Sequence, residues 1–430
     1  MPKTGTAEVR GTRNALAAER LPWGVIAICG AAIAFDGYDL VIYGATLLSL
    51  RQEWGMSAAE AGLLGSLPLA GMLLGSILAG MAADRLGRRR VFVTAVAWFS
   101  VFTVACALAD GPVVFAGLRL LAGLGLGGVM PVAAALTTQA APSGRGNLAY
   151  VIMQSGYPVG GMGASLLALT QLSVLGWRAM YAVAAVPLLV IVPLALRWLP
   201  RTPAAHVDTG EGRLARAGQA RAAVQLPAVS GDAGEVGSVR VLFAPLLRRY
   251  TLVFWGMSLA SLLFVYGMNT WLPSLMVGAG HTISSGLAFL AAFNAGAIVG
   301  GVGGGWAADR WGSRRVVASS FGCGAAAVGV LAVVSTESVL LAAVALAGFG
   351  AVGTQTLING WVTRFYPAHV RATGIGWSLG IGRFGGIAGP FAVGVIEQAS
   401  GATGAAFALF AAVAVGGAVL AGWSGAGRGV

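Results

Sequence analysis

Four charged residues lie inside long apolar stretches of this sequence, namely Asp36, Asp39, Arg119 and Arg383. An ionised side chain at the centre of a bilayer costs about 2.5–3.5 kcal/mol on insertion scales, so such residues usually mark a functional site. Asp36 and Asp39 are three positions apart and therefore share one face of a helix. Because two carboxylates this close cannot both ionise at low cost, we interpret the pair as a proton carrier.

Arg119 is the candidate partner of this pair. With a helical rise of about 1.5 Å per residue, Asp36, Arg119 and Arg383 all fall in the middle or the outer half of the bilayer, where they could line one cavity. Arg119 could modulate the aspartates or anchor an anion, and the first role is favoured. The structural alternative is a static Asp–Arg pair that fixes two helices, although such a pair needs only one aspartate. We expect Asp36→Asn and Asp39→Asn each to abolish uphill uptake of a substrate.

The elements that must hold these residues are membrane-spanning helices. The chain has 430 residues, of which 57% are hydrophobic and only 10% are charged, whereas a soluble domain usually has about 25% charged residues. Apolar segments of about 20 residues recur along the whole chain, and each can cross a bilayer as a helix. We therefore expect an all-α membrane protein with twelve transmembrane helices. They are predicted at 22–48, 57–82, 91–109, 112–136, 148–172, 177–197, 250–278, 285–307, 315–335, 338–362, 373–396 and 403–423.

The net charge of +12 is spread over many loops, which argues against a single footprint for nucleic acid. If the N-terminus is cytoplasmic, most Lys and Arg residues fall in loops on that same side, and the positive-inside rule then predicts both termini in the cytoplasm. The first 20 residues lack the apolar core of a signal peptide. We expect a multi-pass protein of the cytoplasmic (inner) membrane.

The distribution of cysteine and histidine argues against an enzyme. All three cysteines fall inside predicted spans, so neither a disulfide framework nor a metal site is expected. All three histidines lie in predicted loops, and the spans contain no pattern of a nucleophile with its base. We predict no catalytic activity and no cofactor.

Two loop segments repeat each other. GMAADRLGRRR (80–90) and GWAADRWGSRR (305–315) both read G-x-x-x-D-R-x-G-x-R-R, and each follows the second span of its half. Such a repeat predicts two six-helix bundles with the same orientation, related by an axis along the membrane normal. The predicted organisation is a tail at 1–21, an N-terminal bundle at 22–197, a cytoplasmic linker at 198–248, a C-terminal bundle at 249–424 and a tail at 425–430.

The repeated loop and the twelve spans resemble the major facilitator superfamily over essentially the whole chain. In that family the loop carries charged contacts that latch the two bundles as they rock. The alternative, topogenic charges and tight turns, explains the arginines but not the repeated Asp and Gly. The resemblance implies a gating role for Asp84, Arg85, Gly87, Arg89 and Arg90, and for Asp309, Arg310, Gly312, Arg314 and Arg315.

Further motifs resemble one branch of that superfamily, the aromatic acid:proton symporters. GLRLLAGLGLGG (117–128) is similar to the R-x-x-x-G-x-G-x-G motif of proton-coupled facilitators, which is associated there with proton transfer; Ala122 stands where Gln is usual. D-G-x-D-x-x-x-x-G (36–44) in the first span resembles the signature of the branch. So do FVYGMNTWLPSLM (264–276) and RFYPAHVRATGIGWSLGIGRFGGIAGP (364–390).

The branch imports benzoate-like anions with protons, and several residues here suit that chemistry. A carboxylate on a ring needs a cationic anchor, and the guanidinium of Arg383 can bind one through two hydrogen bonds. Its structural alternative is a bond to backbone carbonyls, and the aromatic candidates could equally be core or lipid-facing residues. The candidate walls are Phe264, Tyr266, Trp271 and Trp377, and the candidate amides are Asn269, Asn294, Gln355 and Asn359.

The sequence therefore predicts a monomeric transporter that imports an aromatic carboxylate, benzoate or a hydroxybenzoate, together with protons by alternating access. SGYPVGG (155–161) loosely resembles a motif of drug:proton antiporters, so proton-driven efflux of aromatic or lipophilic compounds is the alternative. We interpret this segment as a kinked, closely packed helix.

Overall fold

The computed structural model describes residues 21–142, 145–200, 239–245 and 247–424. The predicted N-terminal tail, most of the linker and the C-terminal tail lie outside these residues. Within them the chain is helical and contains no strand. The N-terminal bundle consists of α2 (Trp23–Trp54), α3 (Ala58–Leu86), α4 (Arg88–Cys106), α5 (Pro112–Ala140), α6 (Gly146–Gln154), α7 (Gly156–Ala182), η1 (Pro187–Ile191) and α8 (Val192–Trp198).

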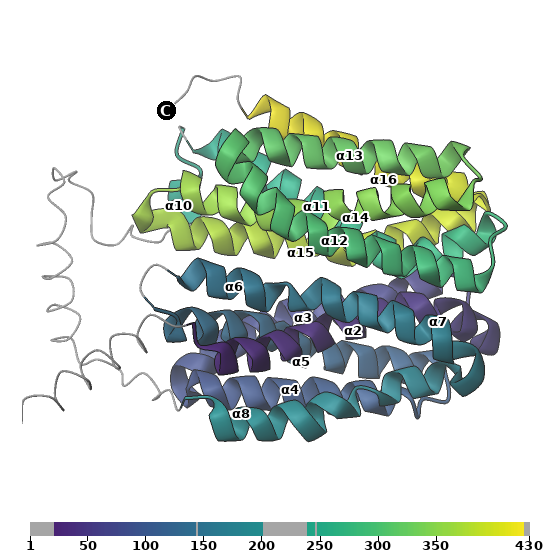
Figure 1. Ribbon diagram of the computed structural model, residues 1–430, viewed down its shortest axis with the longest axis horizontal. Helices are drawn as coiled ribbons and strands as arrows, with labels where there is room; N and C mark the ends of the chain where they lie inside the picture. The colour runs from purple at the N-terminus through teal and green to yellow at the C-terminus, as the bar shows by residue number, and fades with distance from the viewer. Residues whose placement is uncertain (1–20, 143–144, 201–238, 246, 425–430) are drawn as a thin grey trace, which may run out of the picture.

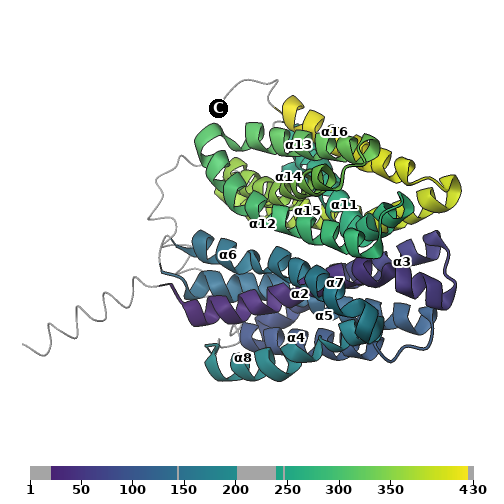
Figure 2. The ribbon, with the colours of Figure 1, turned by 45° about the vertical axis from the view of Figure 1, so that its right-hand side comes forward.

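The C-terminal bundle follows the short helix α10 (Val239–Leu242). Figures 1 and 2 show the two bundles stacked on each other, with their long helices roughly parallel. We call the end with Trp198 and Arg248 the linker end, on the left in Figure 1, and the opposite end the far end. The helices of this bundle are α11 (Arg248–Gly278), α12 (Ile283–Trp311), α13 (Ser313–Val333), α14 (Glu337–Phe365), α15 (Ala368–Ser400) and α16 (Thr403–Trp423).

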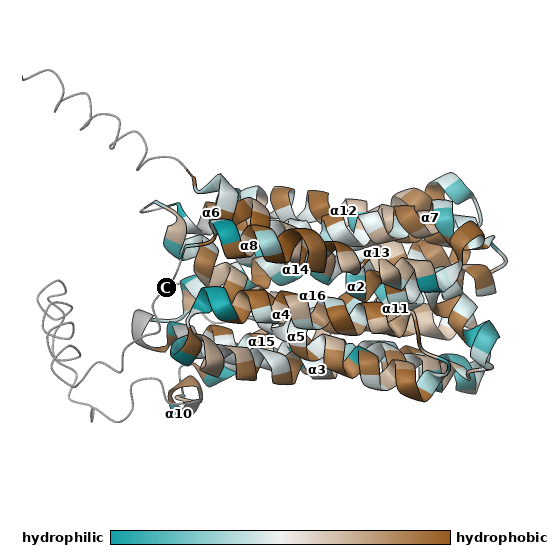
Figure 3. Ribbon diagram, turned by 90° about the horizontal axis from the view of Figure 1, so that it is seen from below, coloured by the Kyte–Doolittle hydropathy of each residue, from teal (hydrophilic) through white to brown (hydrophobic). Residues whose placement is uncertain are grey.

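The predicted spans are confirmed: the described residues contain eleven long apolar helices and one shorter apolar helix, Pro187–Trp198. The difference from twelve long helices lies at Gly176, which interrupts α7 with a φ of 74°. A left-handed φ is accessible to glycine at little cost, so the chain turns back there without leaving a loop. The sixth span begins just after Gly176 and continues through η1 and α8. In Figure 3 hydrophobic residues cover the middle of the bundles, and hydrophilic ones gather near the ends.

Glycines allow the helices within each bundle to approach closely. A Cβ on Gly160 of α7 would collide with the carbonyl of Ala34 on α2, and one on Gly296 of α12 would collide with the carbonyl of Ala345 on α14. Backbone contact of this kind is typical of helix packing in membranes. At Ser155 the fifth span divides into α6 and α7, and Gly156 and Gly160 both contact the backbone of α2. The predicted close packing of 155–161 is confirmed, and the kink stays a prediction.

The two bundles meet through α2 with α11, α3 with α15, and α7 with α12. Near the far end the contact is tight. A Cβ on Gly44 of α2 would collide with the carbonyl of Asn269 on α11. Arg51 also forms an ion pair of 3.2 Å with Glu397 of α15. These contacts close the interface at the far end.

Candidate functional site

Asp39 and Arg119 form an ion pair inside the N-terminal bundle. Arg119 Nη1 donates to Asp39 Oδ2 at 2.6 Å and Nη2 donates to the Asp39 backbone carbonyl at 3.2 Å. The Thr103 hydroxyl donates to Asp39 Oδ1 at 2.6 Å. Each side chain of the pair is only 1% exposed. The pair and Thr103 together connect α2, α5 and α4.

The surroundings of Arg119 complete its coordination. Its guanidinium carbon lies 5.7 Å from the centroid of the Tyr43 ring and 5.9 Å from that of Tyr181, within range of cation–π attraction. One turn further along α5, a Cβ on Gly123 would collide with the carbonyl of Pro68 on α3. The glycines of this motif therefore pack α5 against its neighbours, and Arg119 is fixed at the level of Asp39.

Asp36 lies one turn nearer the linker end and has a different environment. Its side chain is 2% exposed, and its Oδ1 has no hydrogen-bond partner among the described residues. The charges that act on it are Asp39 on its own helix and Arg383 on α15. Tyr266 of α11 interacts electrostatically with both Asp36 and Arg383. Asp36 therefore faces the interface between the bundles, whereas Asp39 faces the interior of one bundle.

Arg383 reaches across that interface. Its Nη1 donates to the Met72 carbonyl at 2.6 Å and to Ser76 Oγ at 2.7 Å, both on α3. Its Nη2 and Nε make no hydrogen bond to any described residue. One edge of the guanidinium is thus held by the opposite bundle, and the other edge is available for a carboxylate. The ring of Tyr266 lies against α15 close to this group. A Cβ on Gly386, three residues after Arg383 on the same helix, would be 2.8 Å from the Tyr266 ring.

The predicted amide residues form two separate pairs. Asn294 Nδ2 donates to Asn269 Oδ1 at 3.2 Å, and both residues are buried. Gln355 Nε2 donates to Asn359 Oδ1 at 3.0 Å on α14, where both side chains are half-buried. The Oδ1 of Asn294 and the Oε1 of Gln355 have no partner within the described residues. The Asn294 oxygen is packed against Gly161, where a Cβ would collide with it, so the half-buried Gln355–Asn359 pair is the better candidate to bond a ring hydroxyl.

Three of the predicted aromatic walls make their contacts elsewhere. Trp271 is fully buried, and its Nε1 donates to the Pro390 carbonyl at 2.8 Å. It lies further along α11 than Tyr266, toward the far end. Trp377 is 42% exposed and stacks on Trp255 with ring centroids 5.7 Å apart. Phe264 packs against Phe410 in the core of its own bundle. Among the predicted walls, Tyr266 is the one whose contacts place it beside Arg383 and Asp36.

Tyr157 is a residue beside Asp36 that the sequence interpretation missed. It interacts electrostatically with Asp36, and its hydroxyl lies against the hydroxyl of Tyr266. That hydroxyl is buried and forms no hydrogen bond of normal geometry in the described part of the chain. The available signal was a tyrosine placed between Gly156 and Pro158, which we interpreted only as part of a kink.

Comparison with known proteins places the chain in a family. The family model described as Major Facilitator Superfamily matches residues 27–390 and 289–425. The chain belongs to the major facilitator superfamily. It is accordingly a multi-pass membrane protein of a family of transporters, and its bacterial relatives are consistent with the inner membrane.

Curated relatives within the superfamily transport aromatic acids according to their names. The benzoate transport protein of Acinetobacter baylyi is 34% identical over 86% of this chain and 83% of its own length. The gentisate transporter of Corynebacterium glutamicum is 35% identical over 85% and 79%. The 4-hydroxybenzoate transporter PcaK of Pseudomonas putida is 32% identical over 89% and 88%. The predicted resemblance to this branch is confirmed.

A solved structure of the superfamily shows the same fold at lower identity. The crystal structure of a D-xylose-proton symporter has a TM-score of 0.76 with 14% identity, covering 94% of this chain and 97% of that one. This likeness concerns the fold alone.

The repeated loops of this facilitator adopt the same conformation. Gly87 and Gly312 both have φ of 85°, with ψ of 142° and 140°. Arg89 donates to the carbonyl of Leu196, Asp309 accepts from Arg364 at 2.8 Å, and Arg314 donates to the Gly422 carbonyl at 2.6 Å. These contacts stay within one bundle each. The predicted latch between bundles is not among them, and the gating role stays a prediction.

Proposed function

We propose that the protein imports an aromatic carboxylate of the benzoate or hydroxybenzoate class together with protons. The observation that carries this proposal is the position of Asp36, buried and without a partner, opposite Arg383 at the interface of the two bundles. The names of relatives that are 32–35% identical support the substrate class. We expect the protein to act as a monomer in the inner membrane.

The arrangement suggests how proton and substrate binding are linked. When Asp36 is ionised, its carboxylate is the counter-charge of Arg383. When Asp36 is protonated, the guanidinium is left with an uncompensated charge, and a substrate carboxylate can take its place on Nη2 and Nε. Proton binding thereby promotes binding of the anion.

The remaining polar groups would select the ring. Tyr266 offers a flat face beside Arg383, while Gln355 and Asn359 on α14 offer hydrogen bonds to ring hydroxyls. A buried polar group left without its partner costs roughly 1–3 kcal/mol, so these amides would favour hydroxylated rings.

Alternating access requires the far-end contacts to open. On the predicted topology the far end is the outer side, so the closed contacts at Gly44 and Arg51 correspond to an inward-facing state. Opening them would expose Asp36 to the acidic side, and rocking back would release proton and substrate into the cytoplasm.

Purified protein in proteoliposomes tests this function. We expect labelled benzoate or 4-hydroxybenzoate to accumulate when the outside is acidic, and a protonophore to abolish the accumulation. Asp36→Asn should remove uphill accumulation, and Arg383→Gln should remove binding. Export against an inward proton gradient, measured in vesicles of known orientation, would instead support efflux. Accumulation by Asp36→Asn equal to that of the unmodified protein would refute the role of Asp36.

A further inference from the structure

Three polar atoms of the N-terminal bundle, on neighbouring turns at its interface with the C-terminal bundle, are buried and form no hydrogen bond of normal geometry in the described residues. They are Asp36 Oδ1, the Tyr157 hydroxyl and Gln154 Oε1. The Tyr157 hydroxyl, one of the three, lies against the hydroxyl of Tyr266. The large majority of buried side-chain polar atoms have a hydrogen-bond partner. A succession of three exceptions, leading from the middle of α2 toward the linker end, indicates a polar path.

The helices that carry these atoms are in backbone contact. A Cβ on Gly37, next to Asp36, would collide with the carbonyl of Tyr157. The break at Ser155 separates α6, which ends at Gln154, from α7, which carries Tyr157. Ser155 nevertheless keeps helical dihedrals, with φ of −61° and ψ of −15°, so residues three positions apart across it still lie on adjacent turns of one face. Tyr157 therefore lies between Asp36 on one side and Gln154 on the other.

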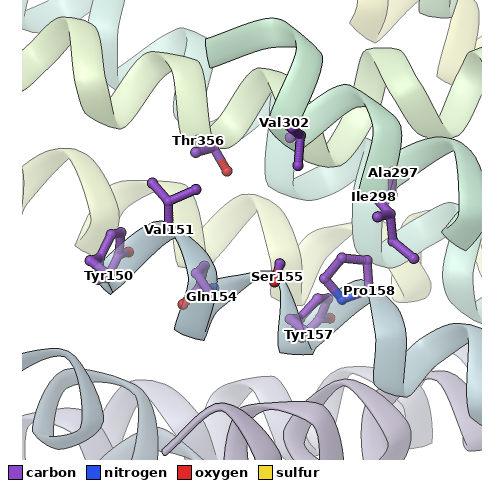
Figure 4. Close-up of a pocket in the computed structure, with 11 residues that line it drawn as sticks. Tyr150, Val151, Gln154, Ser155, Tyr157, Pro158, Ala297, Ile298, Val302 and Thr356 are labelled. Atoms are coloured by element: carbon purple, nitrogen blue, oxygen red, sulfur yellow. The ribbon is translucent and has the colours of Figure 1, made fainter. Parts of the chain in front are cut away.

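Beyond Tyr157 a groove opens between the two bundles. Gln154, Ser155 and Tyr157 line the side that belongs to the N-terminal bundle, and Ala297 of α12 and Thr356 of α14 line the other side. The cavity volume of the groove is about 60 Å³. Figure 4 shows α6 and α7 below this space, with helices of the C-terminal bundle above it. Tyr157 belongs both to the wall of the groove and to the surroundings of Asp36.

We propose that Tyr157 and Gln154 form the route by which the proton leaves Asp36 for the linker end. The O–H bond of the Asp36 carboxyl breaks, and its proton passes to the Tyr157 oxygen as the hydroxyl proton of Tyr157 passes to a water molecule held by Gln154 Oε1. Asp36 is left as a carboxylate, Tyr157 is again neutral, and the proton leaves as hydronium through the groove.

The groups around Asp36 suit this direction of transfer. It faces Asp39 on its own helix, Tyr157 of α7, Tyr266 of α11 and Arg383 of α15. Arg383 is the cation of this set, and it balances the carboxylate that forms once the substrate has left. The route rests on the proposed function, because it needs a proton on Asp36 that must be released.

Two transport assays in proteoliposomes test the route. Counterflow of labelled benzoate at equal pH on both sides requires substrate binding and alternation but no net proton release. Uptake driven by a pH gradient requires substrate binding, alternation and net proton release. Because a positioned proton relay contributes about a hundredfold or more to a transfer step, Tyr157→Phe should lower the driven rate at least about tenfold. Counterflow should stay within about twofold of the unmodified protein. Gln154→Leu should show the same split to a smaller degree.

Tyr150→Phe is the matched control. Tyr150 lines the same groove, but its hydroxyl is not one of the atoms of the path, so both rates should stay within about twofold. Driven uptake by Tyr157→Phe at the unmodified rate would overturn the route. So would an equal loss of counterflow, which would make Tyr157 a substrate or packing residue. A lack of pH-driven uptake by the unmodified protein would instead refute the proposed function, and the route with it.

Discussion

Replacing Asp39 with asparagine should destabilise the N-terminal bundle strongly. The change leaves the Arg119 guanidinium, 1% exposed, without a counter-charge in the described part of the bundle. Removing one partner of a buried ion pair costs about 3–5 kcal/mol. For a unit of 150–250 residues, 1 kcal/mol corresponds to a change of about 2–4 °C in melting temperature. We therefore expect Asp39→Asn to melt roughly 6–20 °C below the unmodified protein in detergent.

Two further variants separate the charge from the hydrogen bonds. Thr103→Val removes one hydrogen bond to the Asp39 carboxylate and should cost about 1.5–3 kcal/mol. Asp39→Asn combined with Arg119→Gln removes both charges, so it should melt above Asp39→Asn alone. If Asp39→Asn melted within about 2 °C of the unmodified protein, the reasoning about an uncompensated buried charge would be refuted.

Three other predictions concern packing, the far-end contact and the anion anchor. In Gly160→Ala the new Cβ meets the Ala34 carbonyl. Because overpacking costs about 1–3 kcal/mol, this variant should melt a few degrees below the unmodified protein. Gly163→Ala is the control, since its Cβ has open space around it, and its melting temperature should not change. A reducible cross-link between cysteines placed at Arg51 and Glu397 should stop uptake, and reductant should restore it; continued uptake by the cross-linked protein would refute the far-end closure as a gate. Arg383→Lys keeps the charge but loses the two-pronged geometry, so KM for the labelled acid should rise about tenfold with an unchanged melting temperature.

The sequence was sufficient for the architecture because hydrophobic length is read directly along the chain. The repeated G-x-x-x-D-R-x-G-x-R-R loop predicted two six-helix bundles. The structure has two such bundles, and Gly87 and Gly312 at the repeated loops have nearly equal φ and ψ. The predicted boundary between the fifth and sixth spans, after 172 and before 177, also agrees with the structure, where Gly176 interrupts α7 with a φ of 74°. A single glycine at positive φ there replaces the loop that normally separates two spans.

The sequence could not separate the roles of the two aspartates. Residues at i and i+3 point about 60° apart around a helix with 3.6 residues per turn, so they can contact different neighbours while sharing a face. Which neighbour each one meets depends on the rotation of the helix, and a helix that is apolar all round gives no pattern from which to read it. Only the three-dimensional packing of the helices shows that Asp39 bonds to Arg119 of α5, whereas Asp36 lies within electrostatic range of Arg383 of α15.

The aromatic residues were equally ambiguous. A tryptophan suits a ligand wall, a bundle interface and the lipid boundary, so residue type did not separate Trp271, bonded to Pro390, from Trp377, stacked on Trp255 at the surface. Tyr266 gained its place from Gly386, which lets the ring lie beside Arg383. A one-dimensional pattern does not record such contacts between distant helices.

Coupling of a proton to transport has to depend on a pair of groups whose separation changes when the bundles rock. Asp39 and Arg119 both belong to the N-terminal bundle, so a rigid-body movement leaves their 2.6 Å contact unchanged. Asp36 and Arg383 belong to different bundles, so the same movement alters their interaction. This difference replaces the expectation from the sequence that either change, Asp36→Asn or Asp39→Asn, abolishes uphill uptake. We now expect the fraction of Asp39→Asn that folds to accumulate benzoate in response to a pH gradient, whereas Asp36→Asn should fold normally and only equilibrate it. Equal loss of accumulation in folded protein of both variants, measured per binding-competent molecule, would show that the two carboxylates act as one site.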